Sequence, residues 1–284
     1  MSPLFAVHIN DGYLWWPWQL GGFAVLAAML AVAAYRVSDR DIPRIGVLTA
    51  VFFVASQAHI PLGGASVHLI LNGLLGVVLR HRAPLAITVG LFLQLLFPHG
   101  GLLTLGVNGC VMGIPAVAAG LLFPLFRRLP WHNQWFRSVC VFAVSGLWLS
   151  LAAVELQILV MRLIGLPFEP RNPPPLWIAE LWWVQALIVA LSVVIVVAER
   201  QLEADPIFHL GLFVGVLTAG ATVLLHVSAL WLGGRGDFQA LAALSLVSHI
   251  PVIAIEGVGV GFAVTVLAKA KPEWLGIAEE HRAG

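Results

Sequence analysis

Charged residues are scarce in this sequence. Lysine and arginine number 15 and aspartate and glutamate 14 among 284 residues, so 10% of the chain is charged, whereas a soluble domain is about 25% charged. The net charge of +1 offers no basic surface for phosphates, which excludes a nucleic-acid-binding protein. Hydrophobic residues make up 60% of the chain. This composition excludes a soluble enzyme or a disordered chain and indicates a multi-pass membrane protein.

Cysteine is also rare. Cys110 and Cys140 both lie in apolar stretches, so we expect buried thiols rather than a disulfide framework. The first ten residues contain no Lys or Arg, and the first apolar run is too long for a cleavable signal peptide. The chain has no GxxxxGK[ST] motif, so it is not an ATPase, and we expect no catalysis. We predict one membrane domain spanning 1–284.

Nine apolar runs alternate with Arg, Pro and Gly clusters. They are 19–35, 45–58, 67–80, 84–98, 106–126, 138–161, 177–198, 207–232 and 243–268. A membrane-crossing helix needs about 20 residues, so the second, third and fourth runs are short. We expect these three to be tilted, packed behind neighbours or partly re-entrant. The prediction is an all-α bundle with seven to nine spans.

The basic residues predict the orientation. With nine spans and an outer N-terminus, twelve basic residues fall on the inner side: Arg36, Arg40, Arg44, Arg80, Arg82, Arg127, Arg128, Arg137, Arg200, Lys269, Lys271 and Arg282. Three fall outside: Arg162, Arg171 and Arg235. Cytoplasmic segments carry the excess of Lys and Arg, so we predict an inner-membrane protein with its N-terminus outside and its C-terminus inside.

Four histidines gather at the predicted outer face: His8, His59, His68 and His99. His226 and His249 fall in the outer halves of their spans. For any single histidine a structural role is the simpler interpretation, but imidazole is also the commonest nitrogen ligand of transition metals. The gathering at one face therefore predicts a metal site that is open to the outside.

Two of the outer connections are rich in glycine and polar side chains. The stretch HIPLGGASVH runs from His59 to His68, and Asn72 follows four residues later, which predicts that His68 and Asn72 share one helical face. The stretch HGGLLTLGVN runs from His99 to Asn108. Non-helical backbone at membrane depth is tolerated where it lines a cavity or is buried in protein, so both loops are candidates for the site.

Two acidic residues, Glu155 and Glu256, lie inside predicted spans. A carboxylate there is paired, protonated or facing a cavity. A hydrogen bond between helices is the favoured role, and a proton relay is the alternative. Several small-residue spacings permit close helix packing, either within the chain or with a partner. They are Ala24/Ala28, Ala27/Ala31, Gly211/Gly215 and Gly257/Gly261.

Four blocks of the chain resemble one family. HINDGYL from His8 is similar to the N-terminal Met-His-Ile-x-Asp-Gly signature of the CbiM/NikM proteins, the metal-capturing subunits of energy-coupling-factor cobalt and nickel transporters. HIPLGGASVHLILNGLLG (59–76) resembles the second block, and HGGLLTLGVN with MGIP (99–115) the third. HIPVIAIEG and KPEWL (249–275) resemble the last. The family-like regions are 8–126 and 207–275, and we interpret 137–205 as a possible insertion of two spans.

The resemblance implies a metal site built around the chain's own N-terminus. In the family, the terminal amine, the amide and imidazole of the following histidine, and a second histidine bind Ni²⁺ or Co²⁺. Mapped by motif, these histidines are His8 and His68, and Val7 stands where the family has its first Met. Four nitrogens in one plane suit Ni(II). His59, His99, Asn72 and Asn108 are further candidates.

Seven residues precede His8 in this sequence, so no free amine adjoins it as written. Three explanations remain open. Translation starts at Val7; or proteolysis removes the leader MSPLFAV; or the extension is retained and side-chain ligands such as His59 or His99 replace the amine.

The resemblance also implies partners and a cargo. The expected partners are an energy-coupling-factor transmembrane coupling subunit, two cytoplasmic ATPase subunits and a small accessory membrane subunit. The cargo is Ni²⁺ or Co²⁺, for nickel enzymes or cobalamin synthesis, and we expect no prosthetic group. Two rival functions are an intramembrane haem- or metal-binding redox protein and an accessory membrane subunit without metal affinity.

Overall fold

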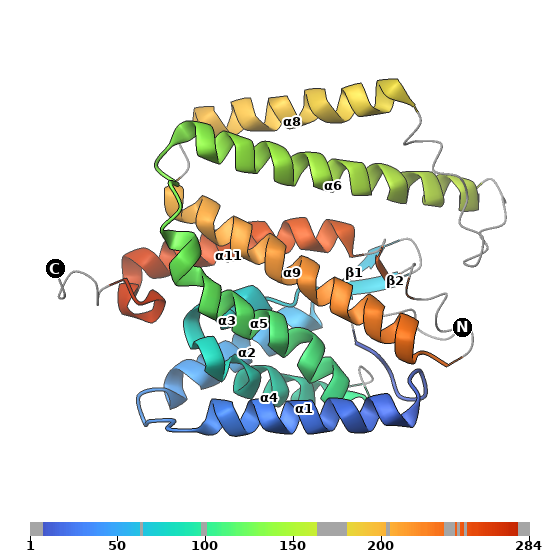
Figure 1. Ribbon diagram of the computed structural model, residues 1–284, viewed down its shortest axis with the longest axis vertical. Coiled ribbons are helices and arrows are strands. Elements are labelled where there is room, and N and C mark those ends of the chain that lie inside the picture. Colours follow the sequence, from blue (N-terminus) through green and yellow to red (C-terminus); the bar gives the residue numbers. More distant parts are fainter. Residues whose placement is uncertain are drawn as a thin grey trace.

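The computed structural model describes residues 8–62, 65–97, 101–163, 181–202, 205–235, 242, 245–246 and 249–277. In this part the chain is a bundle of long helices with one short β-hairpin (Figure 1). The helices are α1 (Trp16–Ala34), α2 (Ile42–Gln57), α3 (Asn72–Leu79), α4 (Ala83–Gln94), α5 (Leu105–Arg127), α6 (Gln134–Leu163), α8 (Trp182–Leu202), α9 (Pro206–Gly233) and α11 (Ile250–Ala270). The hairpin is β1 (His59–Leu62) and β2 (Ala65–His68), and two 3-10 turns are η1 (Arg80–Arg82) and η2 (Pro272–Leu275).

Proline defines where many of these helices begin. Five of them carry proline in the first turn: Pro17, Pro43, Pro84, Pro206 and Pro251. Proline suits this position because its fixed φ matches the helix and because its missing N–H would have no intrahelical acceptor there. The Asp205 side chain also accepts the backbone N–H of Ile207 at 3.0 Å, which caps α9.

Seven stretches of the described chain are long and apolar enough to cross a membrane, which confirms the multi-pass prediction. One of them, residues 72–94, is broken at η1, where Arg80 has a φ of 54°. The two ends of this segment lie at the same end of the molecule. Gln94, at one end, lines a pocket with His8, and the His8 ring stacks on His68, which shortly precedes Asn72 at the other end. The segment is therefore a pair of short antiparallel helices. With 8 and 12 residues, α3 and α4 extend only about 12 and 18 Å.

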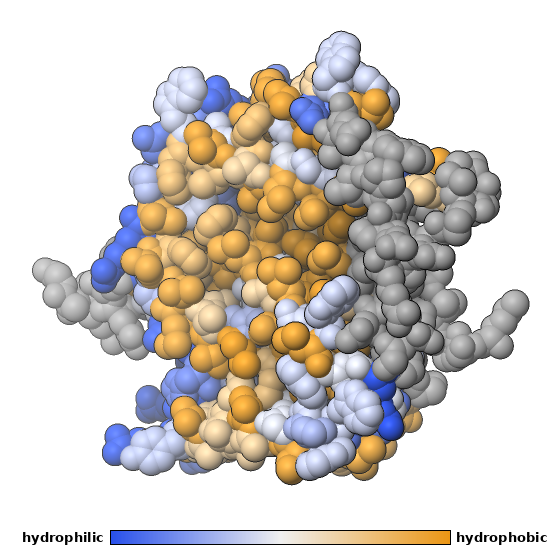
Figure 2. All heavy atoms as spheres, turned by 45° about the vertical axis from the view of Figure 1, so that its right-hand side comes forward, coloured by the Kyte–Doolittle hydropathy of each residue, from blue (hydrophilic) through white to orange (hydrophobic). Residues whose placement is uncertain are grey.

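Apolar side chains form the outer surface of the bundle. In Figure 2 they occupy the middle of the visible face, and hydrophilic residues lie along its left edge. Exposed tryptophans sit at helix ends: Trp15, Trp16, Trp182, Trp183 and Trp231. This is the distribution of an apolar belt with aromatic anchors in a bilayer.

Helices α9 and α11 pack closely along their length. A Cβ added at Gly211 would lie 2.8 Å from the Cα of Gly261, and one at Gly215 would lie 2.9 Å from the Cα of Gly257. These two glycine spacings therefore serve internal packing. In contrast, the alanines at 24, 27, 28 and 31 lie on the exposed face of α1.

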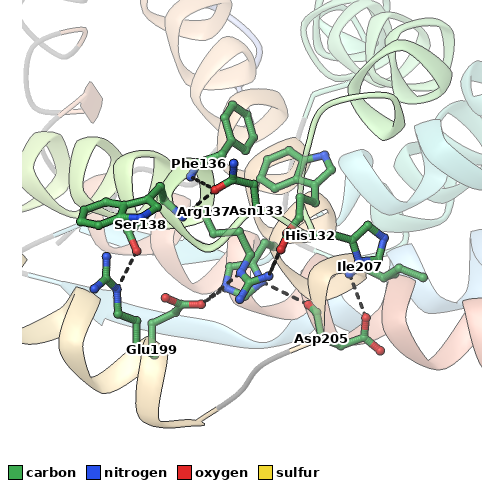
Figure 3. Close-up of polar contacts among 12 residues, drawn as sticks. His132, Asn133, Phe136, Arg137, Ser138, Glu199, Asp205 and Ile207 are labelled. Carbon is green, nitrogen blue, oxygen red and sulfur yellow. Dashed lines mark hydrogen bonds and ion pairs between the residues drawn. The ribbon is translucent and has the colours of Figure 1, made fainter.

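Helices α6 and α8 pack on each other at one side of the bundle (Figure 1). A polar cluster ties their ends to α9 (Figure 3). Within it, Glu199 on α8 contacts Arg137 on α6 at 3.5 Å and the Nε2 of His209 on α9 at 2.8 Å. The Nε of Arg200 donates to the Ser138 hydroxyl at 2.9 Å. These contacts fix the α6–α8 pair where its own apolar contacts with the bundle are few.

Two of the basic residues predicted to lie inside, Arg36 and Arg82, are linked at one end of the bundle. Arg82 pairs with Asp41 at 2.8 Å and also donates to the Arg36 carbonyl. Hydrogen bonds from Ser38 lower the pKa of the Asp41 carboxyl, and the charges of Arg82 and Arg44 lower it further. The start of α1 and the end of α11 lie at opposite ends (Figure 1). Which end faces the cytoplasm stays a prediction from the basic residues.

We predict that Gly215→Ala destabilises the protein by about 1–3 kcal/mol. The new methyl group would meet the backbone of α11, which cannot move without separating the helices. Gly220→Ala is the matched control on the same helix, because a Cβ there has no atom within 4 Å. Thermal unfolding in detergent measures both, and equal midpoints for the two variants would contradict the packing.

Candidate metal-binding site

The rings of His8 and His68 stack inside the bundle. Their Nε2 atoms lie 3.0 Å apart, and the ring centroids are 4.7 Å apart with an interplanar angle of 27°. Both side chains are buried, with 3% and 0% of their surface exposed. The Nδ1 of His68 lies 2.9 Å from the carbonyl oxygen of Leu69. A carbonyl oxygen can only accept a hydrogen bond, so Nδ1 must be the donor. The proton therefore belongs on Nδ1, and the lone pair of Nε2 points toward His8, as in metal-binding histidines.

A β-hairpin delivers His68 to this position. Strands β1 and β2 pair antiparallel, and His59 lies opposite His68 in the register. The predicted shared helical face of His68 and Asn72 is wrong, because His68 ends a strand and α3 begins only at Asn72. Between them, Leu71 adopts a left-handed φ of 49°, which turns the chain into the helix. Sequence spacing suggested a helix because the run that follows is uniformly apolar.

Asn108 on α5 holds the segment that carries His8. The N–H of Ile9 donates to Asn108 Oδ1 at 2.9 Å, and Asn108 Nδ2 donates to the Ile9 carbonyl at 2.9 Å. The Thr104 hydroxyl donates to the same carbonyl. Buried backbone groups outside a helix need such partners. The backbone of Ile9 is thus satisfied by α5, which fixes the neighbouring His8.

Asp11 anchors the next turn of this segment. Its Oδ1 accepts the N–H groups of Leu103 and Thr104 at 2.9 and 3.1 Å, where α5 begins. A carboxylate at a helix N-terminus is stabilised by the helix dipole. Any side chain at Gly101 would collide with Asp11, so glycine is required for this approach. Further along, the N–H of Trp15 donates to the Gly233 carbonyl at 3.0 Å, which joins the segment to the end of α9.

Glu256 on α11 holds the segment that carries His68. Its carboxylate accepts the N–H of Ile70, and it accepts the N–H of Leu71 at 3.0 Å (Oε1) and 2.9 Å (Oε2). These N–H groups belong to the short loop between His68 and α3. Glu256 is 1% exposed, so these bonds provide the compensation that a buried carboxylate needs. The favoured role for Glu256 was a hydrogen bond between helices; the structure instead shows hydrogen bonds from the loop before α3 to this side chain on α11.

Asn72 connects three helices at the same level. Its Nδ2 donates to the Met112 carbonyl on α5 at 3.0 Å and to the Thr222 hydroxyl on α9 at 2.7 Å. This side chain therefore fastens the start of α3. Asn108 has a comparable role, since both ends of its amide bond the backbone of Ile9.

A small pocket opens beside His8. It is lined by His8, Leu91, Gln94, Leu95, Gly101, Leu105 and Asn108. Gln94 donates to the Ser56 hydroxyl, and its buried Oε1 has no hydrogen-bond partner in the described part of the chain. Gln94, Asp11 and Thr104 were not among the predicted site residues. The lone amide of Gln94 in an otherwise apolar helix was the signal that could have identified it.

The remaining predicted residues lie wholly or partly outside the part of the chain that the structure describes. Val7 and His99 lie outside the described residues. For His59, only the backbone pairing with His68 is described, and the side chain of Glu155 is not described either.

The comparisons with known proteins agree in one family. Residues 8–199 and 178–274 match the family CbiM, described as "Cobalt uptake substrate-specific transmembrane region". A Haemophilus influenzae protein named for metal transport is 42% identical over 118 residues, which cover 41% of this chain and 57% of that protein. The cobalt transport protein CbiM of Geobacter sulfurreducens is 31% identical over 239 residues, covering 79% and 61%. The chain thus spans about three fifths of the length of these relatives.

The fold has a solved counterpart. The crystal structure of a transition metal transporter superimposes with a TM-score of 0.55, at 19% identity, and covers 97% of this chain and 99% of that one. At this identity the likeness concerns the fold alone. It extends over α6 and α8 as well as over the family-like blocks.

We predict that Asn108→Ala releases the segment that begins at His8. The variant removes two buried hydrogen bonds of Ile9 and costs about 1–3 kcal/mol in stability. Hydrogen exchange followed by mass spectrometry should show faster exchange in residues 8–14 than in wild type. Asn10→Ala is the control, because Asn10 makes no side-chain hydrogen bond in the described part of the chain. Unchanged exchange in Asn108→Ala would show that Asn108 does not hold the segment.

Proposed function

This chain belongs to the CbiM family, and we propose that it captures Ni²⁺ or Co²⁺ through the imidazoles of His8 and His68. The family is a membrane component of cobalt transport and not an enzyme. The single observation that carries the proposal is the 3.0 Å separation of the two Nε2 atoms within the bundle.

The distance fits a shared cation. Metal–imidazole bonds are about 2.0–2.1 Å long, so two such nitrogens at right angles around one ion lie about 2.9 Å apart. His8 and His68 need little movement to reach this arrangement. The proton on the Nδ1 of His68 leaves its Nε2 in the neutral, metal-binding form. Borderline ions such as Ni²⁺ and Co²⁺ accept nitrogen ligands of this kind.

The ring orientation of His8 bears on how the site is completed. A chelate between the amide and the ring of one histidine uses Nδ1, because that nitrogen is closer to the backbone. In the structure Nε2 of His8 faces His68, so the chelate requires the His8 ring to turn. Mass spectrometry of the purified protein's N-terminus decides the ligand set. A chain beginning at Val7 supplies the amine chelate, and a chain retaining residues 1–7 relies on side chains.

Members of this family work with other transport components. We propose that this chain does so with an energy-coupling-factor coupling subunit and two cytoplasmic ATPase subunits, which drive release of the cation inward. A small accessory membrane subunit is a further proposed partner. Co-purification with these components from cells that express the whole system tests this part.

We predict that His68→Ala weakens Ni²⁺ and Co²⁺ binding by more than about 100-fold. That exceeds the usual effect of changing a residue that only orients a ligand. His81→Ala is the matched control, because His81 is exposed at the other end of α3. Isothermal titration calorimetry with purified protein measures the affinity of both variants. The affinity of the wild-type protein should also fall as the pH is lowered, since protons compete with the cation for the imidazoles. Equal affinities of His68→Ala and wild type would show that the chain lacks this site.

Glu256→Gln should weaken binding by about 10–100-fold without changing the number of cations bound at this site. Glutamine keeps one acceptor oxygen, but it places an NH2 group where the second carboxylate oxygen accepts the N–H of Leu71 and it removes the negative charge, so the loop holding His68 is anchored more weakly. Glu199→Gln changes a carboxylate in the polar cluster at the other end of the bundle and serves as the control. Loss of affinity in both variants to the same degree would indicate general destabilisation instead.

A further inference from the structure

A second pair of histidines lies in the described part of the bundle, between α9 and α11. His226 is on α9, and His249 directly precedes α11. The ring centroids are 6.1 Å apart with an interplanar angle of 44°. Both side chains are buried, with 3% and 2% of their surface exposed. Neither belongs to the His8–His68 contact or to the bonds that support it.

The hydrogen bonding of His249 resembles that of His68. Its Nδ1 contacts the carbonyl oxygen of Ser245, and this oxygen can only accept a hydrogen bond. The proton therefore resides on Nδ1, and Nε2 carries a lone pair. This nitrogen is buried and has no hydrogen-bond partner in the described part of the chain. Histidines that bind metals have this arrangement: one ring nitrogen donates to a carbonyl, and the other is left to bind the metal.

His226 also presents a nitrogen without a partner. Its Nδ1 is buried and makes no hydrogen bond to any described residue. Buried polar groups in proteins are normally paired, and each exception calls for an explanation. Two such nitrogens on neighbouring rings, from α9 and the start of α11, have a common explanation in a cation that both would bind.

The spacing of the rings allows this. With a metal–nitrogen bond of about 2.0–2.1 Å, two imidazoles on opposite sides of one ion have centroids roughly 6 Å apart. The observed separation is 6.1 Å. No group of three or more His, Cys, Asp or Glu side chains that could hold a metal occurs among the described residues. The proposed site therefore rests on these two imidazoles among the described residues.

The pair lies at the same end of the molecule as the first site. In Figure 1 the start of α11 and the C-terminal part of α9 lie at the same end of the bundle as β1 and β2. Glu256, which holds the loop after His68, follows His249 by two turns of α11. Thr222, which bonds Asn72, precedes His226 by one turn of α9. The same two helices therefore support the first site and carry the second pair.

We propose that His226 and His249 form a second binding site for a borderline transition-metal cation such as Ni²⁺ or Co²⁺. The site uses imidazole nitrogens that the first site does not use. It binds more weakly than a site with three or four protein ligands, so the cation exchanges readily. Its existence does not depend on metal binding by His8 and His68.

Metal titration of the purified full-length chain tests the second site in the His8→Ala/His68→Ala background. Equilibrium dialysis against Co²⁺ should find one remaining cation per chain. Adding His249→Gln should weaken this remaining binding at least about tenfold. Adding His81→Gln, which removes an exposed imidazole, should leave it unchanged. If the background variant binds no cation, or if His249→Gln binds Co²⁺ as well as its parent, the proposal is wrong.

A second readout covers the case in which His249→Gln fails to fold. X-ray absorption of Co²⁺ bound to the His8→Ala/His68→Ala variant should show scattering from two imidazoles, and one fewer after His226→Gln. A shell of oxygen ligands alone would overturn the proposal. The two sites fail independently: a wild-type chain whose binding is insensitive to His68→Ala but is lost with His249→Gln refutes the first site and supports the second.

Discussion

The need to pair buried backbone groups dominates this structure. Both proposed ligands, His8 and His68, lie on irregular or extended chain inside a bundle of apolar helices, where the backbone cannot hydrogen-bond to water. Side chains supply the partners. Asn108 bonds both backbone groups of Ile9, and Glu256 accepts the N–H groups that follow His68. Without these bonds, the two segments would no longer hold the imidazoles next to each other.

The packing of the helices positions the side chains that make these hydrogen bonds. The glycine contacts between α9 and α11 bring two backbones close together, so Glu256 and Thr222 reach the α3 region from adjacent helices. Asn72 then joins α3 to both α5 and α9. The polar anchors and the apolar packing are therefore interdependent. Precise placement of ligands in this way is what a site needs to bind a cation selectively.

Part of this arrangement was predictable from the sequence. Apolar runs and basic residues predicted the multi-pass helical bundle, and the motif blocks singled out His8 and His68 among ten histidines. The β-hairpin and the late start of α3 were missed, because the run after His68 is apolar without a period that separates strand from helix. The partners of Glu256 could not be derived, since they lie about 185 residues away in the chain. Asp11 and Gln94 act through contacts that only the folded chain reveals.

The central claim is that folding brings His8 and His68 around one cation. Anomalous X-ray diffraction at the nickel edge, from crystals of wild-type protein grown with Ni²⁺, tests it most directly. The account predicts an anomalous peak within about 2.0–2.1 Å of a ring nitrogen of both histidines. Nickel bound at other residues, with no peak between these two rings, would contradict it.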